Sequence, residues 1–192
     1  MFRRMTRERF LADHELESLM AVVRSRTHLH QPRDHALFAL LANTGIRPSE
    51  ALALTVADCH LAARPAWIRV RRLKRRHAPE PITSLPLHPK VAKVVKRYVA
   101  TLPRASTARL FPFTKRQSDR LFRYYAGKAG IAPTYKLYSL RHTVGMRLWR
   151  HTRDLRVMQA IMGHVHLKAT SGYVHVAPER MRDAHAKLGT IE

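Results

Sequence analysis

Four short stretches of this sequence decide its interpretation: Thr44-Gly45-Ile46-Arg47-Pro48-Ser49-Glu50, Leu140-Arg141-His142-Thr143, Ile161-Met162-Gly163-His164 and Thr170-Ser171-Gly172-Tyr173-Val174-His175-Val176. Arg141 precedes His164 by 23 residues, and His164 precedes Tyr173 by 9. A guanidinium group is planar, always charged, and binds two phosphate oxygens at once. A phenolate can attack phosphorus. Together these residue types predict a site that grips a phosphodiester and attacks it.

The overall charge indicates a polyanionic partner. The chain has 192 residues, of which 36 are Lys or Arg and 13 are Asp or Glu, for a formal net charge of +23. Hydrophobic residues make up 45%, enough for the core of one domain. A domain with such an imbalance repels itself unless an anion is near. Nucleic acid is the first candidate and an anionic membrane surface the second, with a merely basic, ribosome-like protein as the plain alternative.

Other global features favour a cytoplasmic protein without disulfides. Cys59 is the single cysteine, so no intrachain disulfide can form, which fits a reducing compartment. The longest apolar run, near residues 36–42, is too short to span a bilayer. The basic N-terminus has no apolar segment of the signal-peptide type behind it. We therefore expect a cytoplasmic location.

Hydrophobic periodicity predicts a mostly helical chain. A first helix carries Leu16 to Val23 with Asp13 as its N-cap, and a polar loop at 24–33 ends in Gln31-Pro32. Asp34 then opens a second helix, which Gly45 breaks, and Pro48 fits the first turn of a third. Apolar spacing predicts later helices around 91–99, 121–125, 140–149, 155–161 and 178–188.

One small sheet is expected beside the helices. Ile68 and Val70 alternate with arginines, which suggests a strand, and residues 82–87 form a second apolar run that ends before Pro89. The basic segment at 71–77 joins them, so the pair forms an antiparallel hairpin that presents positive charge. The fold class is therefore α+β, mostly α-helical with a small antiparallel hairpin.

These motifs resemble the catalytic domain of the tyrosine recombinases, the phage integrase family. The first catalytic arginine of that family sits in a Thr-Gly-x-Arg-x-x-Glu segment, which Arg47 and Glu50 match, and Arg141 matches the second arginine's box. His164 matches the Leu-Gly-His box with Met162 in place of Leu, and Tyr173 matches the Tyr-x-His motif. The resemblance implies Tyr173 as nucleophile, Glu50 as the residue that orients Arg47, and two arginines that balance charge on the phosphorane.

The basic hairpin has two interpretations. By resemblance, Lys74 is the general acid that protonates the departing 5′ oxygen, because the family's lysine follows an Ile-x-Val strand. The alternative is that Lys74 only contacts phosphate, as its neighbours would. The DNA-binding candidates on this hairpin are Arg71, Arg72, Arg75 and Arg76.

One position departs from the family pattern. The family often has a histidine three residues before the second arginine, and Tyr138 stands there. Its phenol can hydrogen-bond to phosphate, but the usual candidate base for the attacking tyrosine is missing. Histidine pairs such as His28 with His30 lack a cysteine cluster or an acidic third ligand in register, so we expect no metal and no other cofactor.

The resemblance covers nearly the whole chain and implies one catalytic domain over residues 1–192, with a basic extension at 1–10 and a helical tail at 174–192. It implies a site-specific recombinase from a bacterium or mobile element that cuts and rejoins double-stranded DNA through a 3′-phosphotyrosine. It also implies a tetramer on paired sites, joined through the tail. The alternatives are a catalytically inert or accessory DNA-binding protein of the same fold and, more distantly, a relaxing enzyme like the type IB topoisomerases.

Overall fold

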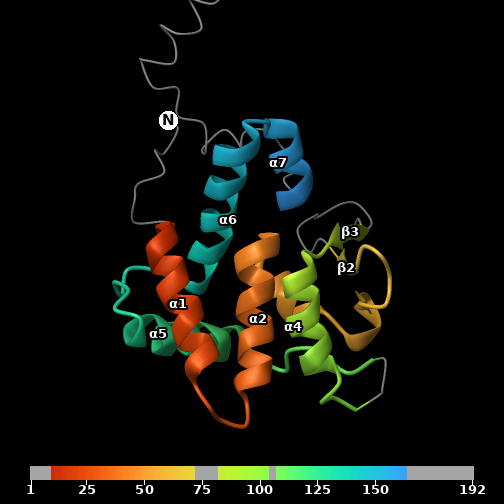
Figure 1. Cartoon of the computed structure of the whole chain (residues 1–192), viewed down its shortest axis with the longest axis horizontal. Coiled ribbons are helices and arrows are strands. Elements are labelled where there is room, and N and C mark those ends of the chain that lie inside the picture. Colours follow the sequence, from red (N-terminus) through yellow and green to blue (C-terminus); the bar gives the residue numbers. More distant parts are fainter. Residues whose placement is uncertain (1–9, 72–81, 104–106, 164–192) are drawn as a thin grey trace, which may run out of the picture.

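A computed structural model describes residues 10–71, 82–103 and 107–163. Within these ranges the structure is mainly helical with one small sheet (Figure 1), as predicted. In chain order the elements are α1 (Asp13–Ser25), α2 (Gln31–Thr44), α3 (Pro48–Ala53), the 3-10 turn η2 (Val56–Asp58), β1 (Cys59–His60), β2 (Trp67–Arg71), β3 (Ile82–Pro86), α4 (Pro89–Val99), α5 (Lys115–Lys128), α6 (Leu137–Thr152) and α7 (Leu155–Met162).

The helix α2 is the centre of the molecule. From Asp34 to Ala42 every residue is buried, because apolar side chains point in all directions around the helix. Helices α1, α4 and α6 pack around it, as Figure 1 shows. The helix ends at Gly45, whose φ of 65° is the left-handed conformation that glycine adopts without steric cost. The chain then turns directly into α3.

The sheet lies beside α3 and α4 and is antiparallel in the order β1-β2-β3. The predicted hairpin is present, with Ile68 opposite Leu85 and Val70 opposite Thr83. Ile68, Val70 and Leu85 are buried, so one face of the hairpin joins the core. The strand β1 was not predicted, because two residues are too few to leave an alternating pattern.

A second, smaller core holds α7 against α6. Its fully buried members, Met158 and Met162, pack with Trp149, and Met146, Leu148 and Leu155 lie around them. The helix begins with Asp154, whose carboxylate accepts from Arg156 N at 2.7 Å and Val157 N at 3.2 Å. It ends at Gly163, which has a φ of 61°. The predicted short helix and its glycine stop are confirmed.

Two predicted helix starts are wrong. Ala12, not Asp13, caps α1, because the Glu15 carboxylate accepts the Ala12 N–H at 2.7 Å and Asp13 lies in the first turn. The predicted polar loop at 24–33 is shorter than expected, since α1 runs to Ser25 and α2 begins at Gln31. Pro32 fits the first turn of α2, where no N–H donor is needed, so the helix opens before Asp34.

Asp58 joins the turn η2 to β2. Its buried carboxylate accepts from Thr55 N at 3.0 Å, from Thr55 Oγ1 at 2.8 Å and from Arg69 Nε at 3.0 Å. Burial alone would raise the pKa of this carboxyl, but the Thr55 and Arg69 hydrogen bonds hold the pKa below its usual value.

None of the helices in the part of the chain that the structure describes is long and apolar enough to cross a membrane.

Candidate active site

Arg47 lies where the chain passes from α2 into α3. Glu50 is buried, and one of its carboxylate oxygens accepts the Arg47 N–H at 2.8 Å while the other lies 2.6 Å from Arg47 Nη1. The ion pair expected between Arg47 and Glu50 is therefore present. A single carboxylate fixes both the backbone and the guanidinium of Arg47, which orients the side chain at the start of a helix.

Arg141 is the largest fully buried side chain of α6, only 1% exposed. Its Nη1 donates to the carbonyl oxygen of Gly45 at 2.6 Å, and its Nη2 donates to the carbonyl oxygen of Met162 at 2.6 Å. A carbonyl oxygen carries no formal charge, so these two bonds orient the guanidinium without neutralising it. A buried and oriented positive charge attracts an anion more strongly than an exposed one.

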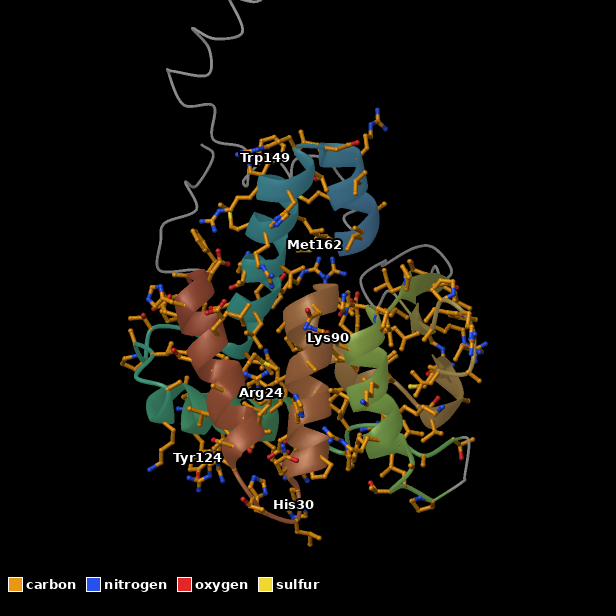
Figure 2. The ribbon with its side chains drawn as sticks, viewed as in Figure 1. Arg24, His30, Lys90, Tyr124, Trp149 and Met162 are labelled. Carbon is orange, nitrogen blue, oxygen red and sulfur yellow. The ribbon has the colours of Figure 1, made fainter. Side chains whose placement is uncertain are left out.

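The two arginines converge because three chain segments meet at the end of α2. Arg47 Nη2 lies 3.5 Å from the carbonyl oxygen of Gly163, next to the Met162 carbonyl that holds Arg141. Figure 2 shows Met162 at the end of α7 nearest to α2. A Cβ on Gly45 would lie 2.8 Å from Met162 Sδ and 3.0 Å from Val144 Cγ1. A glycine is therefore needed for this close approach, as well as for its positive φ.

Neighbouring residues of the Arg141 motif have structural roles. Thr143 Oγ1 accepts the Leu11 N–H at 2.9 Å, which ties the start of α1 to α6. Tyr138 is 43% exposed, and its ring packs edge-to-face with that of His142, one turn further along the helix, with the ring centroids 5.0 Å apart. Its position on the surface leaves the phenol accessible to a ligand.

Arg71 is the one hairpin candidate that the structure describes. Its side chain is half-exposed, and its Nη2 lies 3.5 Å from Asp58 Oδ1. Asp58 therefore holds Arg71 as well as Arg69. The remaining predicted site residues lie outside the described ranges: Lys74, Arg72, Arg75, Arg76, His164, Tyr173 and the tail at 174–192. His164 directly follows Gly163 in sequence. Among residues 10–71, 82–103 and 107–163, no group of His, Cys, Asp or Glu is arranged to hold a metal ion.

The motifs identified the arginines but not what holds Arg141. Its partners are the main-chain carbonyls of Gly45 and Met162, and side-chain patterns carry no information on such partners. The signal that could have found them is the pair of glycines at 45 and 163, each at the end of a helix where carbonyls are left without helical partners.

Comparisons with solved structures identify proteins of the same fold. The XerH recombinase bound to its difH substrate superposes with a TM-score of 0.81 at 19% identity, over 98% of this chain and 56% of that one. The catalytic domain of bacteriophage HP1 integrase gives 0.64 at 23% identity, over 92% of this chain and 93% of that one. These likenesses show the recombinase catalytic-domain fold.

Sequence relatives point the same way. The tyrosine recombinase XerC of Halalkalibacterium halodurans is 27% identical over 92% of this chain, and XerD of Yersinia pestis is 31% identical over 80%. The chain spans 60% of the length of that XerC and 53% of that XerD. The model of the phage integrase family matches residues 9–180, so this chain belongs to the phage integrase family.

Proposed function

We propose that this chain cleaves and rejoins double-stranded DNA at specific sites through a covalent 3′-phosphotyrosine on Tyr173. The observation that carries the proposal is the convergence of Arg47 and Arg141 at one point, each with its guanidinium fixed by hydrogen bonds. Two oriented guanidinium groups can bind the non-bridging oxygens of one phosphodiester. The relatives are named tyrosine recombinases, and XerH is described bound to a DNA substrate.

The proposed chemistry conserves the phosphodiester energy. The Tyr173 oxygen attacks phosphorus, a P–O bond to tyrosine forms, and the bond from phosphorus to the 5′ oxygen breaks. Lys74 donates a proton to that leaving oxygen, and a 5′ hydroxyl later reverses the step. Arg47 and Arg141 stabilise the added negative charge of the pentacoordinate phosphorane, with His164 and Tyr138 donating to its oxygens. No ATP or metal ion takes part in any of these steps.

The hairpin supplies the remaining DNA contacts in this proposal. Arg71, Arg72, Arg75 and Arg76 contact backbone phosphates, so binding weakens as counterions compete. The logarithm of the association constant falls with the logarithm of salt concentration by roughly 0.9 per phosphate neutralised. A slope flatter than about −3 would contradict a broad phosphate-tracking surface.

Paired sites imply more than one copy of the chain. We propose that four copies assemble on two DNA sites and that residues 174–192 of one copy contact the next. Analytical ultracentrifugation on a duplex carrying the site should show assembly that depends on protein concentration and is lost when the tail is removed. A complex that stays at one copy per duplex at all concentrations would contradict the tetramer and favour a relaxing enzyme of the topoisomerase type.

Covalent trapping tests the reaction itself. The protein is incubated in EDTA with fragmented DNA from its source, denatured, and examined for DNA attached to protein. We expect attachment with the native chain and with Tyr124→Phe, an exposed tyrosine on α5, but none with Tyr173→Phe. Sequencing the trapped DNA then identifies the site.

Two other results would decide against this function. Attachment that survives Tyr173→Phe would assign the nucleophile elsewhere. No attachment, together with tight and salt-sensitive DNA binding, would identify an inert binding protein of the same fold.

A further inference from the structure

A basic pocket lies at the end of α2 opposite to Arg47 and Arg141. It has a volume of about 420 Å³ and is formed by the last turn of α1, the α1–α2 loop, the first turns of α2 and the last turn of α4. Its lining residues are Arg24, Arg26, Thr27, His28, Gln31, Pro32, His35 and Arg97. Figure 2 places Arg24 and His30 at this end, far from Met162 at the other. The 14 residues of α2 separate the two ends by about 20 Å.

The charge of the lining is entirely positive. Three arginines reach the pocket from three different elements, and no Asp or Glu is among the described residues that line it. The nearest carboxylate is that of the buried Asp34, which is held by Arg33 Nη2 at 2.9 Å and by the Tyr125 hydroxyl at 3.0 Å. It also lies 3.9 Å from Nε2 of His28, a residue of the lining. Guanidinium groups that repel one another around a cavity are stabilised by an anion between them.

His35 adds a buried group that lacks a partner. It lines the pocket, is only 7% exposed, and its Nδ1 has no hydrogen-bond partner among the described residues. An orphaned buried ring nitrogen costs free energy that a ligand can recover. Burial first, and then the charges of Arg97 and Arg24, lower the pKa of His35. An anion bound between these arginines would oppose the effect of their charges on the ring.

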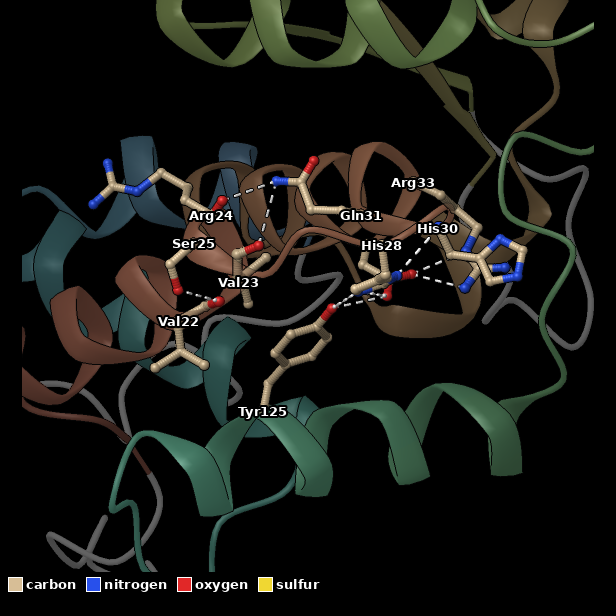
Figure 3. Close-up of polar contacts among 10 residues, drawn as sticks. Val22, Val23, Arg24, Ser25, His28, His30, Gln31, Arg33 and Tyr125 are labelled. Atoms are coloured by element: carbon tan, nitrogen blue, oxygen red, sulfur yellow. Dashed lines mark hydrogen bonds and ion pairs between the residues drawn. The ribbon is translucent and has the colours of Figure 1, made fainter.

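Hydrogen bonds hold the walls of the pocket in place. Gln31 Nε2 donates to the carbonyl oxygens of Val23 at 3.4 Å and Arg24 at 3.3 Å, which ties α2 to the end of α1. His28 Nε2 lies 3.0 Å from the Tyr125 hydroxyl, which anchors the α1–α2 loop to α5. Figure 3 shows both connections, with Tyr125 reaching up from α5 to His28. The loop is therefore fixed from two sides, and the pocket exists before any ligand binds.

We propose that this pocket binds a phosphate group, at a site separate from the one that holds the scissile phosphodiester. Arg24 and Arg97 form charge-assisted hydrogen bonds to its oxygens, and His35 donates from its ring. A volume of about 420 Å³ exceeds a single phosphate and falls within the usual range for small ligands, roughly 300 to 1,000 Å³. The phosphate belongs either to a small phosphorylated molecule or to the backbone of a second stretch of DNA.

Calorimetric titration with pyrophosphate at constant ionic strength tests this site. The background is Arg47→Gln, which weakens phosphate binding at the other end of α2. We expect saturable binding with a Kd below about 1 mM. The double variant Arg24→Gln/Arg97→Gln should weaken it at least about tenfold. Lys93→Gln, an exposed residue one turn earlier on α4, is the matched control and should leave it unchanged.

Duplex binding distinguishes the two sources of phosphate. If pyrophosphate does not saturate the site but Arg24→Gln/Arg97→Gln weakens duplex binding and flattens its salt dependence by about 2, the ligand is a DNA backbone. Equal binding of pyrophosphate by the double variant, or no effect of that variant on either ligand, would overturn the site. Thermal unfolding without ligand checks that each variant is folded. These results do not depend on covalent trapping, so the pocket and the proposed function can fail separately.

Discussion

The two ends of α2 carry similar residues in different surroundings. At the C-terminal end, Arg47 is held by the Glu50 carboxylate and Arg141 by the carbonyls of Gly45 and Met162. At the N-terminal end, Arg24 and Arg97 line a pocket in which the structure shows them no carboxylate partner among the described residues. The first end has acceptors that fix each guanidinium. The second has a fixed cavity whose arginines have no carboxylate partner among the described residues.

The two arrangements suit the two proposed tasks, catalysis and the binding of a separate anion. Catalysis requires guanidinium groups whose positions do not change when charge develops, so the acceptors are built into the fold. Binding of a separate anion requires arginines whose charge is not already compensated, and no described carboxylate lines the pocket of Arg24 and Arg97. The net charge of +23 therefore predicts an anionic partner without locating its site. The hydrogen-bond acceptors around each arginine distinguish one site from the other.

Replacing Arg141 with lysine should have the largest effect, because an ammonium cannot reach the Gly45 and Met162 carbonyls together and present a planar pair of donors to phosphate. We expect the rate of covalent trapping to fall about 10²- to 10³-fold. Arg147→Lys, on the exposed side of the same helix, should trap DNA at the native rate. Equal rates for both variants would mean that Arg141 is structural only.

Gly45→Ala should be the most damaging change to stability at this end. A left-handed alanine costs about 1–2 kcal/mol, and overpacking against Met162 and Val144 adds about 1–3 kcal/mol. Gly130→Ala is the matched control, because Gly130 has a φ of 70° and open space around it, so only the first cost applies. Urea unfolding measures the loss in free energy of unfolding for each variant. The loss in Gly130→Ala gives the cost of the left-handed backbone, and the additional loss in Gly45→Ala gives the cost of the clash. Equal losses would mean that Met162 moves aside without cost.

Glu50→Gln should lower the free energy of unfolding by about 2 kcal/mol, because a neutral amide replaces the carboxylate in the hydrogen bond to the charged Arg47 guanidinium. Trapping should fall as well, since Arg47 is no longer held from both its backbone and its side chain. Glu17→Gln on the exposed face of α1 is the control for loss of one negative charge. A stable but inactive Glu50→Gln would show that orientation matters more than stability.

How far the sequence predicted these features depends on the kind of contact. Arg47, Glu50 and Arg141 stand in local motifs, and the helices around them follow from apolar spacing and from glycine and proline positions. The fold class and the hairpin were predicted correctly for the same reason. The carbonyl partners of Arg141 join residues 96 and 21 positions apart, and no local pattern encodes such distances.

The pocket was not foreseen either. Its arginines come from α1, the α1–α2 loop and α4, and each alone reads as an ordinary surface arginine. The predicted start of α2 at Asp34 was wrong because Gln31-Pro32 is equally typical of a loop and of a first helical turn. Only the packing of α2 against the end of α1 decides between them, through the Gln31 amide.

The smallest expected effect concerns the charge of the pocket itself. In the folded protein, burial and the charges of Arg97 and Arg24 lower the pKa of His35. The unfolded chain therefore binds a proton more readily, and the free energy of unfolding falls as pH drops below the unfolded histidine pKa of about 6.5. Arg97→Gln removes one repelling charge and should raise the pKa of His35, which makes this acid loss smaller. Ligand binding should raise the pKa in the same direction. An NMR titration of the His35 ring measures both pKa changes. An unchanged pKa in Arg97→Gln would mean that Arg97 does not act on the ring.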